Sequence, residues 1–151
     1  MTGIRLIRSA SMSEARGGML RGMSKRRTII PKGMEFYYEQ FHFAPAVREG
    51  KNLYCSGQIG WAGPGHKPPA DPKEQFTLAF ENLKQVLEAA GADFDDVVEI
   101  TTFHVGMQHL GVFGAVKADF LKEPYPAWTA IGVAELAIPG ALVEIRATGR
   151  L

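Results

Sequence analysis

The sequence predicts a single α+β domain in which two helices cover one face of a mixed β-sheet. The chain has 151 residues, enough for one domain with a sizeable core. Two apolar stripes at helical spacing lie between segments rich in β-branched residues, giving the order β-β-α-β-α-β-β. No apolar run approaches the roughly 20 residues that a membrane helix needs, so we expect no membrane partner.

The charge is divided unevenly along the chain. The first 30 residues contain seven lysines and arginines and one acidic residue, for a net charge of +6. The rest of the chain contains ten lysines and arginines and fifteen acidic residues, for a net charge of −5. We therefore expect residues 1–30 to form a disordered basic leader and residues 31–151 to form the folded domain. An organellar targeting peptide is the alternative for the leader, because such peptides are also rich in arginine and poor in acids. The acidic domain makes nucleic acid an improbable partner.

The single cysteine, Cys55, permits no intrachain disulfide and favours a reducing compartment, so we expect a cytoplasmic protein. A lone cysteine in a strand is more often part of the core than a nucleophile. The spacing of the four histidines matches no metal site, so the sequence predicts neither a metal nor another cofactor.

The first half of the chain predicts an irregular segment with a helical turn at 31–42, strands at 43–47 and 52–59, and then a helix. Asp71 is suited to cap this helix and Pro72 to open it. Gly91 is suited to end it. One apolar stripe runs along it, formed by Phe76, Phe80, Leu83, Leu87 and Ala90.

The second half predicts a strand at 97–105, a helix at about 109–121, and strands at 126–135 and 141–148. The 126–135 segment is apolar at both parities, so both of its faces should be buried. Because two helices can cover only one face of the sheet, self-association should cover the other, and we expect an oligomer. Alternation in the last strand should bury Val143 and Ile145 and place Glu144 on the opposite face.

Two features of the strands could carry chemistry. Glu144 lies in the middle of a strand and is the carboxylate most suited to act as a base, although a solvated residue or a pair with Arg146 would look the same. The Ser56-Gly57 pair allows another part of the chain to approach the backbone closely, or exposes backbone N–H groups to a ligand.

Three segments resemble the Rid family (YjgF, reactive intermediate deaminase, endoribonuclease L-PSP-like). They are FAPAVREGKNLYCSGQIG, NLKQVLEAAGADFDDVVEITTFHV and YPAWTAIGVAELAIPGALVEIRATG, which keep the family's order and spacing from Phe43 to the C-terminus. The resemblance implies a chorismate-mutase-like fold and a homotrimer with ligand clefts at the subunit interfaces, without cofactor or metal.

The resemblance also implies an activity, the hydrolysis of 2-imino or enamine acids to 2-oxo acids and ammonia. In the family an arginine binds the substrate carboxylate, and a tyrosine, an asparagine, a Ser-Gly backbone and a glutamate complete the pocket. Here Ser56, Gly57 and Glu144 match the family pattern. The arginine, tyrosine and asparagine are replaced by Trp128, Phe43 and Lys117, and a frequent cysteine by Ala130. The chain thus resembles a divergent subgroup that lacks the substrate-binding arginine.

These replacements predict a trimer that hydrolyses a small uncharged imine, enamine or related C–N compound, with Glu144 as the base. Small 2-imino acids should be poor substrates, because no guanidinium is present to bind their carboxylate. The alternative is a trimer that binds a small molecule without turnover. A ribonuclease is the third choice, since the acidic domain repels phosphate.

Overall fold

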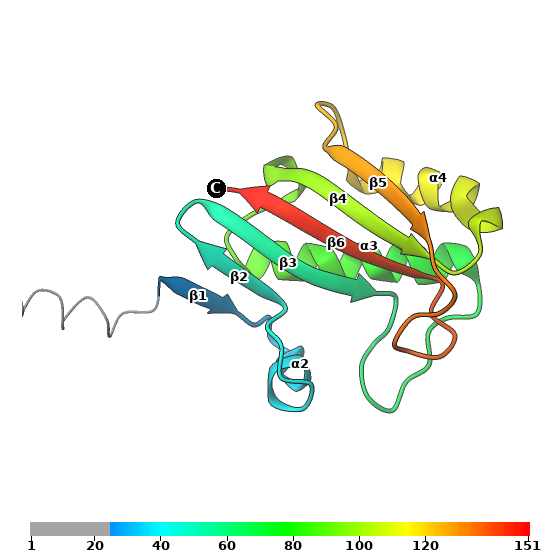
Figure 1. Cartoon of the computed structure of the whole chain (residues 1–151), viewed down its shortest axis with the longest axis horizontal. Helices are drawn as coiled ribbons and strands as arrows, with labels where there is room; N and C mark the ends of the chain where they lie inside the picture. Colours follow the sequence, from blue (N-terminus) through cyan, green and yellow to red (C-terminus); the bar gives the residue numbers. More distant parts are fainter. Residues whose placement is uncertain (1–24) are drawn as a thin grey trace, which may run out of the picture.

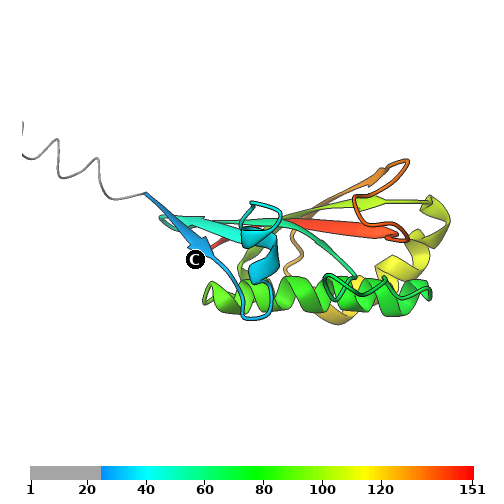
Figure 2. The same ribbon diagram turned by 90° about the horizontal axis from the view of Figure 1, so that it is seen from below.

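The computed structural model describes residues 25–151, which form a six-stranded sheet with two long helices on one face (Figures 1 and 2). The strand order is β1-β2-β3-β6-β4-β5, and every neighbouring pair is antiparallel except β4 and β5. The strands are β1 (Arg26–Ile29), β2 (Ala46–Glu49), β3 (Asn52–Ile59), β4 (Val97–His104), β5 (Ala127–Gly132) and β6 (Val143–Arg150). The helices are α2 (Glu35–Glu39), α3 (Pro72–Ala89) and α4 (Leu110–Phe120), with 3₁₀ turns at Phe94–Asp96 and Met107–His109. The predicted α+β fold with a mixed sheet and helices on one face is confirmed.

Helix α3 forms as the sequence predicts. The Asp71 carboxylate accepts a hydrogen bond from the Glu74 backbone N–H at 2.9 Å, and Pro72 opens the first turn. Gly91, at a φ of +76°, ends the helix in a conformation that side chains disfavour. The apolar stripe is buried against the sheet, and each large side chain in it contributes about 1.5–3 kcal/mol.

The core lies between the two long helices and the sheet. Phe80 of α3 stacks on Phe113 and Phe120 of α4, with ring centroids 5.5 and 5.0 Å apart. On β6, Val143 and Ile145 are fully buried in this core, as the alternation predicts. The odd-numbered positions of β6 therefore face the helices, and the even-numbered positions face away from them.

The N-terminal boundary of the domain differs from the expectation. Strand β1 lies within the predicted 1–30 leader, pairs with β2 and buries Ile29. The expected start at residue 31 is therefore too late: backbone pairing and the burial of a β-branched side chain outweigh the local positive charge. Residues 1–24 of the predicted leader lie outside the described residues.

Strand β5 also differs from the expectation within one chain. It is shorter than the predicted 126–135 strand and is largely exposed, with Trp128 at 39% and Ile131 at 40%. Burial of both faces is therefore wrong for a single chain, and cover by further copies stays a prediction. Across residues 25–151, no helix combines the length and the hydropathy needed to cross a membrane.

Candidate functional site

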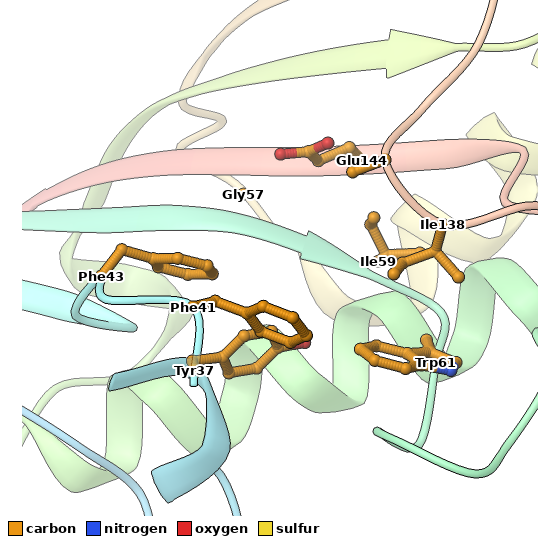
Figure 3. A pocket seen from close by; sticks show the side chains of 9 residues that line it. Tyr37, Phe41, Phe43, Gly57, Ile59, Trp61, Ile138 and Glu144 are labelled. Carbon is orange, nitrogen blue, oxygen red and sulfur yellow. The ribbon is translucent and has the colours of Figure 1, made fainter. Parts of the chain in front are cut away.

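A cavity of about 330 Å³ opens where the segment around α2 meets the ends of β3 and β6 (Figure 3). Aromatic and aliphatic side chains form its walls, and Glu144 contributes a carboxylate. The lining residues are Tyr37, Phe41, Phe43, Gly57, Ile59, Trp61, Ala137, Ile138 and Glu144. The cavity is thus a mostly apolar pocket with few polar groups, which is typical of small-molecule sites.

A bulge in β3 shapes the cavity wall. Cys55 pairs with Ala147 of β6 but Gln58 pairs with Ile145, so Ser56 and Gly57 lie in a register shift between the two strands. The Ser56 hydroxyl donates to the Ala44 carbonyl at 2.7 Å. This bond fixes the segment that carries Phe43, so Ser56 supports the cavity wall without lining it.

Glu144 lies directly over the bulge. A Cβ atom at position 57 would overlap the Glu144 carboxylate, so only glycine leaves room for it there. Burial raises the pKa of the Glu144 carboxyl above its ordinary value. Within residues 25–151 neither a hydrogen bond nor an ion pair is found for this carboxylate, so the pair with Arg146 does not form. A desolvated carboxylate of this kind suits a general base.

The aromatic walls are packed against one another. The Tyr37 ring lies 5.1 Å from the Phe43 ring and 6.4 Å from the Phe41 ring, between centroids. On the other side of the cavity, the Trp61 indole N–H donates to the His66 carbonyl at 2.8 Å. These contacts hold the rings in place, so the cavity is largely preformed.

The loop that carries Ala137 and Ile138 is fixed by a buried glutamine. Gln75 of α3 donates from Nε2 to the carbonyls of Pro69 and Gly140, at 2.9 and 3.0 Å. Its Oε1 accepts from the Leu142 N–H at 2.6 Å. One side chain thus joins the two loops at this end of the cavity.

The remaining predicted site residues form a separate group near β5. The Trp128 indole N–H donates to the Thr102 hydroxyl at 2.9 Å, and the Lys117 ammonium lies 4.6 Å from the Trp128 ring centroid. Ala130 is the register partner of Thr102, on the same strand face as Trp128. Because Glu144 pairs in register with Phe103, it projects from the opposite face of the sheet.

A short polar chain connects Trp128 to the core. Oγ1 of Thr102 lies 2.7 Å from Nε2 of the buried His104. Burial lowers the pKa of the His104 imidazole, which favours its neutral form. With the indole donating to Thr102, the imidazole nitrogen is the available acceptor for the Thr102 hydroxyl. The orientation of Trp128 is therefore built into the fold.

The structure thus sorts the predicted site residues into two groups. Phe43, Gly57 and Glu144 line one cavity, with Ser56 behind it. Lys117, Trp128 and Ala130 cluster elsewhere in the same chain. Sequence reasoning missed Tyr37, Phe41, Trp61 and Ile138; the density of aromatic residues at 36–43 is the signal that could have indicated the first two. Cys55 is buried, and burial raises its thiol pKa to about 12, which confirms the prediction of a core residue.

Comparisons with known proteins identify relatives of this chain. The family model described as endoribonuclease L-PSP matches residues 38–150. RutC family protein YjgH of Escherichia coli is 36% identical over 131 residues, covering 85% of this chain and 98% of that protein. A 2-iminobutanoate/2-iminopropanoate deaminase of Dermatophagoides farinae is 36% identical over 104 residues, covering 68% of this chain and 80% of that protein.

The fold is matched as well. A solved structure of the protein YJGH superposes with a TM-score of 0.77 at 35% identity, covering 85% of this chain and 98% of that chain. The family model spans well over half of the sequence, and the matched residues form the sheet and helices described above. The chain therefore belongs to the Rid/YjgF family.

Proposed function

We propose that this protein hydrolyses a small uncharged imine, enamine or related C–N compound, with Glu144 as the base. The observation that carries the proposal is the desolvated Glu144 carboxylate above Gly57, in a cavity whose other walls are aromatic and aliphatic. Relatives named 2-iminobutanoate/2-iminopropanoate deaminase support the reaction type.

The proposed reaction needs only water and a carboxylate. Glu144 takes a proton from a water molecule whose oxygen attacks the carbon of the C=N bond. The nitrogen receives this proton back from the Glu144 carboxyl, which gives a carbinolamine. Glu144 then takes the proton of the new hydroxyl group and passes it to the nitrogen as the C–N bond breaks. The carbonyl product and ammonia leave, and Glu144 is again a carboxylate. The raised pKa of Glu144 suits this exchange, because a base is most effective when its pKa approaches the working pH.

The preferred substrate is uncharged. Trp128 and Phe43 stand where the family has arginine and tyrosine, so the pocket loses a guanidinium and gains aromatic surface. Loss of a charge-assisted contact to a carboxylate should weaken binding by about 1.5–3 kcal/mol. Lys117 is the nearby cation, but its ammonium lies over the Trp128 ring. We therefore propose that 2-imino acids are poor substrates.

A homotrimer would complete the site. Trp128 and Glu144 lie on opposite faces of one chain's sheet, and Trp128 is exposed on the edge strand β5. In an assembly that covers β5, the group of Lys117, Trp128 and Ala130 from one copy can face the Glu144 cavity of another. This arrangement also supplies the cover that the exposed Ile131 lacks in one chain.

A binding protein without turnover is the second candidate. The observation that favours it is the aromatic lining, which provides a surface for a ligand even without the arginine. Benzophenone imine, a neutral N–H imine, separates the two proposals. Wild type should release ammonia from it faster than buffer does, and Glu144→Gln should not. Binding of the imine without acceleration by the wild type would favour the binding protein.

A further inference from the structure

Tyr37 is a cavity residue that lies before the first family motif, and among the lining residues it alone carries a hydroxyl. It lies on the short helix α2, is only 7% exposed, and lines the cavity together with Glu144 and Phe43. Figure 3 shows its phenol oxygen directed between Phe41 and Trp61, toward the interior of the group of lining side chains. For the part of the chain that the structure describes, no hydrogen bond is found for this hydroxyl. The oxygen is not one of the buried atoms without a partner, so it is accessible from the cavity and available to a ligand.

The phenol is held in a fixed position. Its ring contacts the rings of Phe36 and Phe43, with centroids 4.2 and 5.1 Å away. The Phe43 N–H also donates to the Tyr37 carbonyl at 3.1 Å. Tyr37 and Phe43 therefore form one unit, in which Tyr37 has the hydroxyl that Phe43 lacks.

The charge of Glu144 acts on Tyr37 across the cavity. Burial, and then the negative charge of Glu144, raise the pKa of the Tyr37 phenol, so it stays protonated and can donate a hydrogen bond. The two groups do not bond directly within the described residues. A ligand between them would meet one donor, the phenol, and one acceptor, the carboxylate.

We propose that Tyr37 supplies the cavity's phenolic donor in place of Phe43, and that Tyr37 and Glu144 together select neutral ligands that carry an adjacent acceptor and donor. Carboxamides and N–H imines have this pair of groups, whereas a carboxylate has no donor for Glu144. The inference rests on the proposed function only for the location of the site, because it concerns ligand recognition and not turnover.

The test compares two probes and two tyrosines. Benzamide carries an acceptor and a donor, and toluene carries neither. Tyr37→Phe should weaken benzamide binding about five- to tenfold in a chemical-shift titration, as expected for one neutral hydrogen bond. Toluene binding should not change. Tyr38→Phe, which removes a neighbouring exposed hydroxyl, is the matched control and should leave both titrations unchanged.

Each other outcome is informative. If Tyr37→Phe weakens the binding of benzamide and toluene equally, Tyr37 has a packing role only and the inference is overturned. The inference also fails if Tyr37→Phe binds benzamide as tightly as the wild type, or if the wild type does not bind benzamide. Adding Phe43→Tyr to Tyr37→Phe should restore part of the lost affinity. Tyr37-dependent benzamide binding without hydrolysis of benzophenone imine would contradict the proposed reaction but leave this inference intact.

Discussion

The carboxylate of Glu144 occupies the space that a side chain at Gly57 would fill, at the bulge where β3 shifts register against β6. Because Gly57 has no side chain, this space is left to Glu144, which contributes a carboxylate to the cavity wall. The motif that contains Ser56 and Gly57 therefore has a geometric role: Ser56 fastens the neighbouring segment and Gly57 makes room for the candidate base.

Gly57→Ala should displace this carboxylate. We expect hydrolysis of benzophenone imine to fall at least tenfold, because a shift of about 1 Å in a catalytic group can cost a hundredfold. Overpacking should also lower the free energy of unfolding by about 1–3 kcal/mol. Gly114→Ala is the matched control, since a Cβ there meets nothing within 4 Å and the site lies in helix α4. If a folded Gly57→Ala variant hydrolyses the imine as fast as the wild type, the room that Gly57 leaves for Glu144 is unimportant for catalysis.

Glu144→Gln should change stability in a pH-dependent way. Because burial raises the pKa of Glu144, the folded protein keeps a proton that the unfolded chain has already lost in the window above the ordinary value of 4.5. The free energy of unfolding of the wild type therefore decreases as pH rises through this window, by about 1.4 kcal/mol for each unit by which the pKa is raised.

The glutamine cannot titrate, so the variant does not lose stability in this window. The free energy of unfolding of the variant minus that of the wild type should therefore be larger at pH 7 than below pH 4. Urea unfolding at both pH values measures this difference. Glu135→Gln, which removes an exposed carboxylate, is the control. A variant that gains nothing at pH 7 would argue against a desolvated carboxylate.

Trp128→Arg should produce hydrolysis of 2-iminopropanoate. The new guanidinium would stand at the position where the family binds the substrate carboxylate, and Glu144 would already be present. Trapping with semicarbazide, while an amino acid oxidase generates the imine, measures the gain. Trp128→Phe serves as the uncharged control and should show no gain. If Trp128→Arg folds and assembles but stays inactive, the Glu144 side of the site is not competent for this reaction.

Two truncations locate the N-terminal boundary. Removal of residues 1–24 should leave the melting temperature unchanged, as expected for a leader outside the domain. Removal of residues 1–30 also deletes β1 and the buried Ile29, so the melting temperature should fall by several degrees. Equal melting temperatures for the two truncations would show that β1 adds nothing to stability, and a drop with the shorter deletion would place the boundary earlier.

The sequence predicts the regular elements better than the cavity. Helix α3 begins and ends where its capping residues indicate, because capping and periodicity are local signals. Strand β1 was missed because it has only four residues, of which two are arginines, and its conformation depends on pairing with β2. Tyr37 and Ile138 reach the cavity from irregular segments, and their positions depend on long-range contacts such as those of Gln75.

The sequence alone also does not show on which faces of the sheet Trp128 and Glu144 lie. Both lie on strands that flank β4 in one sheet, yet the register places Trp128 opposite Ile100 and Glu144 opposite Phe103. One residue of register decides which face a side chain occupies, and sequence comparison of single positions does not contain that information. Their proposed meeting therefore depends on assembly.

Assembly is tested by Ile131→Asp in the exposed part of β5. A charge buried between copies is costly, so light scattering should show the wild type as a trimer and the variant as a smaller species. Lys84→Asp, on the exposed face of α3, introduces the same side chain elsewhere and should leave the trimer intact. A stable wild-type monomer would contradict the proposed composite site.

The most direct measurement of the central claim compares two substrates on the unmodified protein. Wild type should accelerate ammonia release from neutral benzophenone imine and have little effect on anionic 2-iminopropanoate, because its cavity offers aromatic walls and a carboxylate in place of a guanidinium. Hydrolysis of 2-iminopropanoate at the rate of an arginine-containing relative, with no acceleration of the neutral imine, would contradict the account.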